Sequence, residues 1–153
     1  MCDFRRILVA VRTLLMTYIV PTEATAWLVL RVISHLPANG VGIVDVVHAW
    51  EIMGMSGCRH PDTKHVSMLN RQTLRMIPRI KEITLIVRIL SGILACNATM
   101  GGTGCVIGKC LDRLEYLMMT ESVDTDVVRS ISAICADLRW PAPLLLRHDQ
   151  NRA

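Results

Sequence analysis

Aromatic side chains are scarce in this chain, because Phe, Trp and Tyr make up 4% of its 153 residues. Leu, Ile, Val and Met must therefore fill most of the core. Charged residues reach 20% and apolar residues 52%, a balance that excludes an intrinsically disordered chain. No run of about 20 uncharged apolar residues occurs, so we expect no transmembrane anchor.

Signals for export are also missing. Arg5 and Arg6 precede an apolar stretch, but Arg12 interrupts it and no cleavage site of small residues follows. We therefore expect a cytoplasmic protein. In that compartment its six cysteines stay reduced, and we predict free thiols rather than a disulfide framework.

Features of a nucleic-acid-binding protein are weak. The net charge is +4, from 17 Lys and Arg against 13 Asp and Glu. The basic residues are scattered along the chain, and the few aromatic residues do not alternate with them as stacking platforms would. We expect no nucleic-acid partner.

Helical periodicity dominates what is present. Apolar residues recur at steps of three and four, no long stretch alternates with period two, and Pro and Gly separate the periodic stretches. We predict a single all-α domain over 1–153, with seven or eight helices around a buried central helix. The predicted helices cover 4–20, 23–36, 43–53, 66–77, 80–94, 106–119 and the stretch from Ser122, its N-cap, to 140, with a short amphipathic end at 144–148.

The stretch 105–119 is the predicted central helix. Leu111 and Leu114 lie on its long apolar face, and Gly104 and Gly108 are expected to allow close backbone approach at its start. We therefore expect this segment to be the most buried part of the protein.

The spacing of residues along the chain does not support a metal, phosphate-binding or catalytic site. Cys58, His60 and His65 could ligate zinc, but their spacing is not that of a zinc finger, and 54–65 is predicted to be an exposed connector. The glycine-rich segment 100–109 lacks the phosphate-loop spacing, and Lys109 is not followed by Ser or Thr. No local signature marks a cysteine nucleophile. We expect no enzyme, no metal and no cofactor.

Residues 106–140 resemble the apoptosis-regulating Bcl family. Segment 106–117 reads Val-Ile-Gly-Lys-Cys-Leu-Asp-Arg-Leu-Glu-Tyr-Leu and is similar to the first Bcl-homology motif, with Gly108 at the motif glycine, Lys109 at the usual Arg and Glu115 at the Glu. Another register places 103–105 at the motif without any charge. We prefer the first, because segment 121–124 then follows in order as in family members.

This resemblance implies a Bcl-like helical bundle with a surface groove. In the family, such a groove receives the amphipathic death-motif helix (the third Bcl-homology motif) of a pro-apoptotic protein, whose Asp meets a cation of the groove. A short, diverged member without an anchor is similar to viral inhibitors of apoptosis, which act on the host in the cytoplasm of its cells. The groove residues implied here are Val87, Leu90, Val106, Ile107, Gly108, Lys109 and Leu111.

Two other functions remain open from the residues alone. The chain has more apolar helical faces than one core of this size needs, and a homodimer interface would also use them. One alternative is a helical interaction module of another kind, such as an adaptor or an inhibitor of immune signalling. The other is a Cys/His metal protein using Cys58, His60 and His65.

Overall fold

The computed structural model describes residues 4–17, 23–37, 39–56, 63–96 and 103–138. Within these ranges the chain forms seven α-helices, one short 3-10 helix and no strand, which confirms the all-α prediction. The helices are α1 (Phe4–Thr17), α2 (Glu23–Ser34), α3 (Ile43–Met55), α4 (Thr63–Met76), the 3-10 helix η1 (Ile77–Arg79), α5 (Ile83–Ala95), α6 (Thr103–Thr120) and α7 (Thr125–Asp137). None of these helices is both long and apolar enough to cross a membrane.

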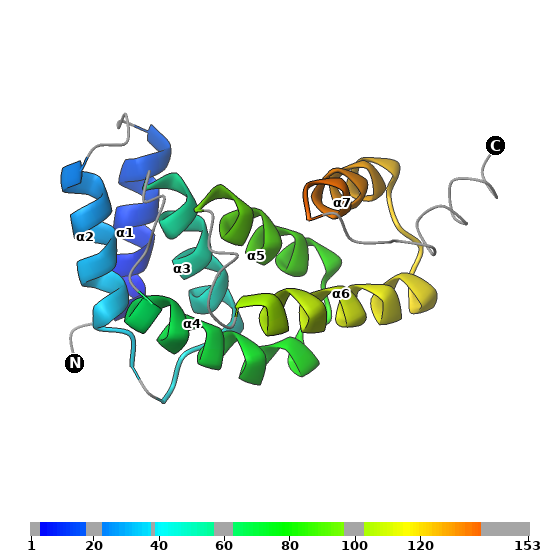
Figure 1. The fold of residues 1–153 in the computed structure, drawn as a ribbon, viewed down its shortest axis with the longest axis horizontal. Helices are drawn as coiled ribbons and strands as arrows, with labels where there is room; N and C mark the ends of the chain where they lie inside the picture. Colours follow the sequence, from blue (N-terminus) through cyan, green and yellow to red (C-terminus); the bar gives the residue numbers. More distant parts are fainter. Residues whose placement is uncertain (1–3, 18–22, 38, 57–62, 97–102, 139–153) are drawn as a thin grey trace.

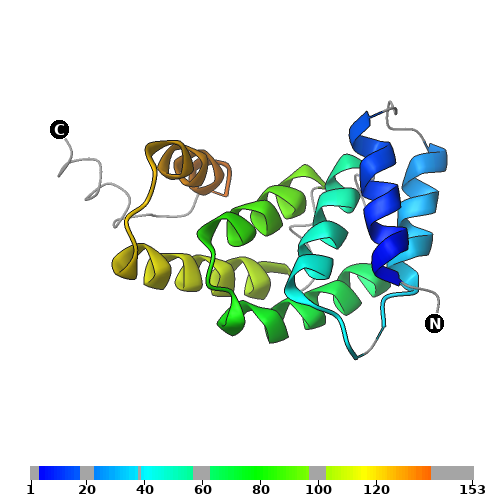
Figure 2. The same ribbon diagram turned by 180° about the vertical axis from the view of Figure 1, so that it is seen from behind.

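The helices are arranged around α3 and α5. α1 and α2 lie side by side at one end of the molecule, and α7 lies at the opposite end (Figure 1 and, from behind, Figure 2). α3 packs against α1, α2, α4 and α5, whereas α6 packs against α4, η1 and α5. The centre of the bundle is therefore α3 together with α5.

Burial confirms that α3 is the central helix. Seven of its 13 residues are buried, and Trp50 and Met53 are 0% exposed. The prediction that 105–119 is the most buried segment is wrong, because eight of the 18 residues of α6 are buried. The reason is amphipathicity: α6 has polar positions such as Lys109 and Asp112 on an exposed face, whereas α3 is apolar on nearly every side.

Close backbone approach occurs between α3 and α5. A Cβ atom at Gly92 would lie 2.5 Å from the carbonyl oxygen of Trp50, and one at Gly54 would lie 2.9 Å from Cβ of Ala95. At Gly104 and Gly108 a Cβ atom would meet nothing within 4 Å. The expected close approach at Gly104 and Gly108 is therefore wrong, and glycine has this role at the α3–α5 contact.

Hydrogen bonds join α3 to its neighbours. The indole Nε1 of buried Trp50 donates to Oγ1 of Thr73 at 2.9 Å, and that hydroxyl donates to the carbonyl oxygen of Leu69 at 2.7 Å. Asp45 accepts hydrogen bonds from the guanidinium of Arg5 at 3.0 and 3.1 Å and from the backbone N–H of Gly42 at 3.0 Å. These contacts join both α4 and α1 to α3.

Some predicted helix ends differ from the observed ones. α3 continues through Gly54 to Met55, so the start of the predicted connector 54–65 is helical. The N-cap of α7 is Asp124 rather than Ser122, and its carboxylate accepts from the backbone N–H of Asp126 at 3.4 Å. The end of the connector is helical as well, because α4 begins at Thr63. Its middle, 57–62, and the predicted short end at 144–148 lie outside the described residues.

Candidate protein-binding site

The predicted groove residues do not share one open surface. Leu90, Val106, Ile107 and Leu111 are at most 7% exposed and belong to the core. Val87 and Gly108 are half-buried, and Lys109 is exposed. Side chains of the protein itself therefore fill the space between α5 and α6. Val87, a predicted groove residue, borders an open pocket.

The pocket beside Val87 lies between α5 and α7. Its volume is about 320 Å³, which accommodates one or two large apolar side chains, and its lining is mostly apolar. α7 contributes half-buried Val127. The lining residues are Thr84, Val87, Arg88, Asp126, Val127 and Ser130.

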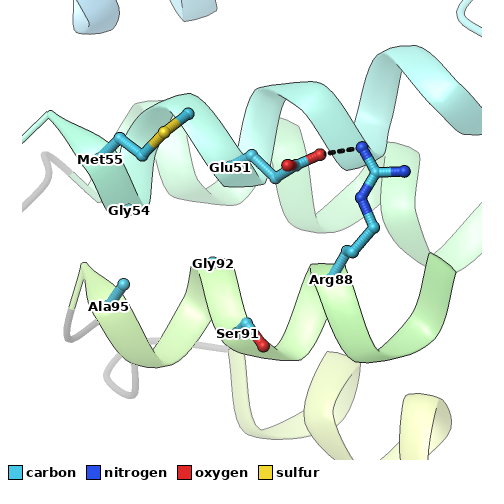
Figure 3. A pocket seen from close by; sticks show the side chains of 7 residues that line it. All are labelled: Glu51, Gly54, Met55, Arg88, Ser91, Gly92 and Ala95. Carbon is cyan, nitrogen blue, oxygen red and sulfur yellow. Dashed lines mark hydrogen bonds and ion pairs between the residues drawn. The ribbon is translucent and has the colours of Figure 1, made fainter. Parts of the chain in front are cut away.

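A second pocket lies between α3 and α5 (Figure 3). It is also mostly apolar, with a volume of about 250 Å³. Glycines and other small residues form its floor, Met55 lies at one end and the Glu51–Arg88 ion pair at the other. The lining residues are Glu51, Gly54, Met55, Arg88, Ser91, Gly92 and Ala95.

Arg88 belongs to both pockets, so they meet at this side chain. We call the residues that line the two pockets the Arg88 surface. The surface follows α5 from Thr84 to Ala95, with α7 beside its first part and α3 beside its last part.

Glu51 fixes the position of Arg88 but neutralises only part of the local positive charge. One carboxylate oxygen of Glu51 accepts from Nη2 of Arg88, and the other accepts from Arg12 at 3.1 Å and 3.3 Å. Two guanidinium groups therefore share one carboxylate, and the triad has a net charge of about +1. A carboxylate from a partner could bind Arg88 while Arg12 still compensates Glu51.

His48 lies one helical turn before Glu51. Its Nδ1 atom is buried and has no hydrogen-bond partner. Burial lowers the pKa of His48, and the nearby guanidinium groups of Arg12 and Arg88 lower it further, while Glu51 and Asp45 oppose them. His48 is therefore neutral at pH 7, and it adds no positive charge to the triad.

The ion pair between exposed Arg5 and buried Asp45 serves the fold. Burial alone would raise the pKa of Asp45, but the hydrogen bonds from Arg5 and from the Gly42 backbone N–H outweigh burial, and the pKa is lowered. Asp45 is thus ionised at neutral pH and lines neither pocket.

Nucleophilic and metal chemistry gains no support from the described residues. Burial raises the pKa of the Cys110 thiol to about 12, and burial and then Glu115 raise the pKa of Cys135, so both remain protonated thiols. No group of three metal-ligating side chains occurs in the described part of the chain. Cys58, His60 and the side chain of His65 lie outside it.

The main cation of the surface is not the one expected from the sequence. Arg88 is one of several basic residues scattered along the chain, whereas the resemblance implies Lys109 as the cation of the groove. The available signal was that Arg88 adjoins Val87 within an otherwise apolar helix, since the segment 83–95 holds no other charged residue. Such an isolated charge in an apolar helix requires a partner, here Glu51.

Comparison of the chain with protein-family models, with curated proteins and with solved structures finds no match in any of the three.

Proposed function

We propose that this protein binds an amphipathic helix of a partner protein on the Arg88 surface. Apolar side chains of the helix enter the two pockets, and an acidic side chain between them pairs with Arg88. Because of the resemblance of 106–140 to the first Bcl-homology motif, we propose that the helix is the death motif of a pro-apoptotic Bcl-family protein. Its sequestration would inhibit cell death.

The observation that carries the proposal is the position of Arg88 between two mostly apolar pockets. Helix-in-groove recognition needs apolar sites separated along the ligand helix, which give affinity, and a polar contact that fixes the register. Arg offers a carboxylate two parallel hydrogen bonds, whereas Lys109 could offer a single charge centre. Arg88 therefore suits the death-motif Asp better than Lys109, the cation expected from the sequence.

The test is calorimetric titration with a synthetic death-motif peptide and with the same peptide carrying Asn in place of its Asp. Both peptides are titrated into the wild-type protein, Arg88→Gln and Lys109→Gln. We expect the Asp-to-Asn change to weaken binding about tenfold in the wild-type protein and in Lys109→Gln, and to have little effect in Arg88→Gln. If the Asp-to-Asn change instead lost its effect in Lys109→Gln, the Asp would pair with Lys109, the cation expected from the sequence.

A second variant blocks the pocket without changing a charge. Ser91 is exposed and lines the α3–α5 pocket, so Ser91→Trp should weaken peptide binding at least about tenfold by occupying that space. Ser132→Trp is the matched control, because Ser132 is exposed on α7 and lines neither pocket. Equal binding to both variants at unchanged melting temperature would rule out the Arg88 surface as the site.

A different helical interaction module is supported by a second surface, on α1 and α2. Large apolar side chains are exposed on α1 and α2, with Met16 at 61% and Trp27 at 64%. Such a surface suits an adaptor contact or the homodimer considered above. Failure of every death-motif peptide to bind, together with loss of a dimer on Trp27→Ala in sedimentation analysis, would favour this second function.

A further inference from the structure

The outer face of α4 and η1 carries a row of basic side chains. Arg71 and Arg75 are four residues apart, so they lie on one face of α4 about 6 Å apart along its axis. Arg79 follows after four more residues in η1, and Lys64 and Lys81 extend the row at its ends. All five side chains are exposed.

Four of these cations, Arg71, Arg75, Arg79 and Lys81, have no partner among the ion pairs of the described residues, whereas Arg5, Arg12 and Arg88 each hold a carboxylate. No Asp or Glu occurs from 63 to 81. Arg71, Arg75 and Arg79 therefore form a stripe of positive charge along α4 and η1, and the nearest following carboxylate in the sequence is Glu82, after Lys81.

α6 adds a further cation at the η1 end of the row. The Nε atom of Arg113 donates to the carbonyl oxygen of Ile80 at 2.9 Å, and its guanidinium lies 4.9 Å from the centre of the Tyr116 ring. Because Ile80 directly follows Arg79, these contacts hold a fixed positive charge beside the end of the row.

We infer that this basic face, made of Arg71, Arg75, Arg79, Lys81 and Arg113, binds an acidic helix of a partner protein. A helix with Asp or Glu at every fourth position presents carboxylates about 6 Å apart, the same interval as Arg71 and Arg75. Arg pairs with carboxylates through two parallel hydrogen bonds. A helix whose carboxylates have the same interval as Arg71 and Arg75 should therefore bind more tightly. This surface is separate from the Arg88 surface and does not depend on it.

Other polyanions fit the basic face less well. α4 and η1 contain no Phe, Trp or Tyr, so a single-stranded nucleic acid would have no stacking platform along the row itself and would find one at Tyr116, beside Arg113 at its end. The apolar side of α4, including Val66 and Leu69, is buried in the core, so α4 cannot insert that side into a lipid interface.

The experiment uses two synthetic peptides of identical composition. One is an alanine-based helix with Glu at every fourth position, and the other carries the same Glu residues in one consecutive block. Binding of each labelled peptide to the full chain is measured by fluorescence anisotropy at low and at physiological salt. We expect the spaced peptide to bind at least about fivefold more tightly than the block peptide, with affinity falling as salt rises.

Reversing the charge of single Arg residues tests whether the spaced peptide binds on the basic face. Arg75→Glu should weaken binding of the spaced peptide about tenfold, whereas Arg129→Glu should leave it unchanged, since Arg129 is exposed on α7 and pairs with Asp126. Melting temperatures of both variants verify that they are folded. Equal binding of the two peptides, or no effect of Arg75→Glu, would overturn the inference.

An RNA duplex and vesicles of phosphatidylcholine with phosphatidylserine are titrated in parallel. Either of them binding more tightly than the spaced peptide, with the same loss on Arg75→Glu, would assign the basic face to that class of partner and overturn the inference of an acidic helix.

Discussion

Two pairs of helical glycines in this protein have opposite surroundings. Gly54 and Gly92 lie at the α3–α5 contact, where an added methyl group would meet the backbone or side chains of the facing helix. Gly104 and Gly108 lie at the start of α6, where an added methyl group would meet nothing within 4 Å. The first pair sets the distance between two core helices, and the second pair sets no interhelical contact.

The two regions differ in charge as well. The α3–α5 contact is bordered by the Arg12–Glu51–Arg88 triad, in which each charge has a partner. The start of α6 carries exposed Lys109, which forms no ion pair with the described residues. A pocket with an anchored cation is therefore found at α5, whereas the cation expected from the sequence, Lys109, is in α6.

The largest expected effect is that of Gly92→Ala. The new Cβ atom would lie 2.5 Å from the carbonyl oxygen of Trp50 and 2.7 Å from its carbonyl carbon, so α5 must move away from α3. We expect the free energy of unfolding to fall by about 3 kcal/mol, even though Ala gains roughly 1 kcal/mol in helix propensity. Urea denaturation measures the change, and an unchanged midpoint would show that the two helices are not in contact here.

The next effect tests how α3 is tied to α4. Thr73→Val keeps the shape of the side chain but leaves the N–H of Trp50, a 0% exposed residue, without its acceptor. We expect a loss of about 1–3 kcal/mol in the free energy of unfolding. Thr120→Val on α6 is the control, because Thr120 is exposed and hydrogen-bonds within its own helix. A similar loss for both variants would mean that the buried hydrogen bond contributes nothing specific.

More of the fold than of the candidate site could be predicted from the sequence. Periodicity locates helices such as α1 and α5, because each has one apolar face at steps of three and four. Periodicity does not indicate which helix is the most buried. α3 is apolar nearly all round and shows little periodicity, whereas the longer α6 is clearly amphipathic. Leu90 illustrates the consequence: its position in an apolar stripe does not distinguish a core residue, as observed at 1% exposure, from a groove anchor.

The candidate site required coordinates because its parts are distant in sequence. Arg12, Glu51 and Arg88 come from three helices, and no spacing rule connects them. Likewise, Val127 lines a pocket because α7 packs against α5 beside Val87. The basic face of α4 was accessible to sequence reasoning through the four-residue interval from Arg71 to Arg75, but the scattered distribution of the other basic residues obscured it.

A smaller effect concerns His48 and pH. Its pKa in the folded protein is below the ordinary value of 6.5, so the unfolded chain binds a proton first as pH falls. Stability is therefore lost progressively below about pH 6.5, until the folded form is protonated as well. We expect His48→Gln to reduce this loss by under about 1 kcal/mol between pH 7.5 and 5, as measured by urea denaturation at several pH values.

The titration of Asp45 provides the internal control for this profile. Its lowered pKa stabilises the fold above the ordinary value of 3.8, and that contribution is lost as pH falls further, in a separate acidic range. Loss of stability that persists unchanged between pH 7.5 and 5 in His48→Gln would assign the effect to other groups.

The smallest effect is expected from Gly108→Ala, and it has the opposite sign to that of Gly92→Ala. Space is open around Gly108 and its backbone is helical, so Ala should raise the free energy of unfolding by about 0.5–1 kcal/mol. The variant also distinguishes the two possible binding sites. If a death-motif peptide binds the Arg88 surface, its affinity should not change, because Gly108 lines neither pocket. If the peptide instead packs closely on Gly108 and Lys109, the added methyl group should weaken binding while the protein itself becomes more stable, a combination that thermal denaturation and calorimetry on the same sample would reveal.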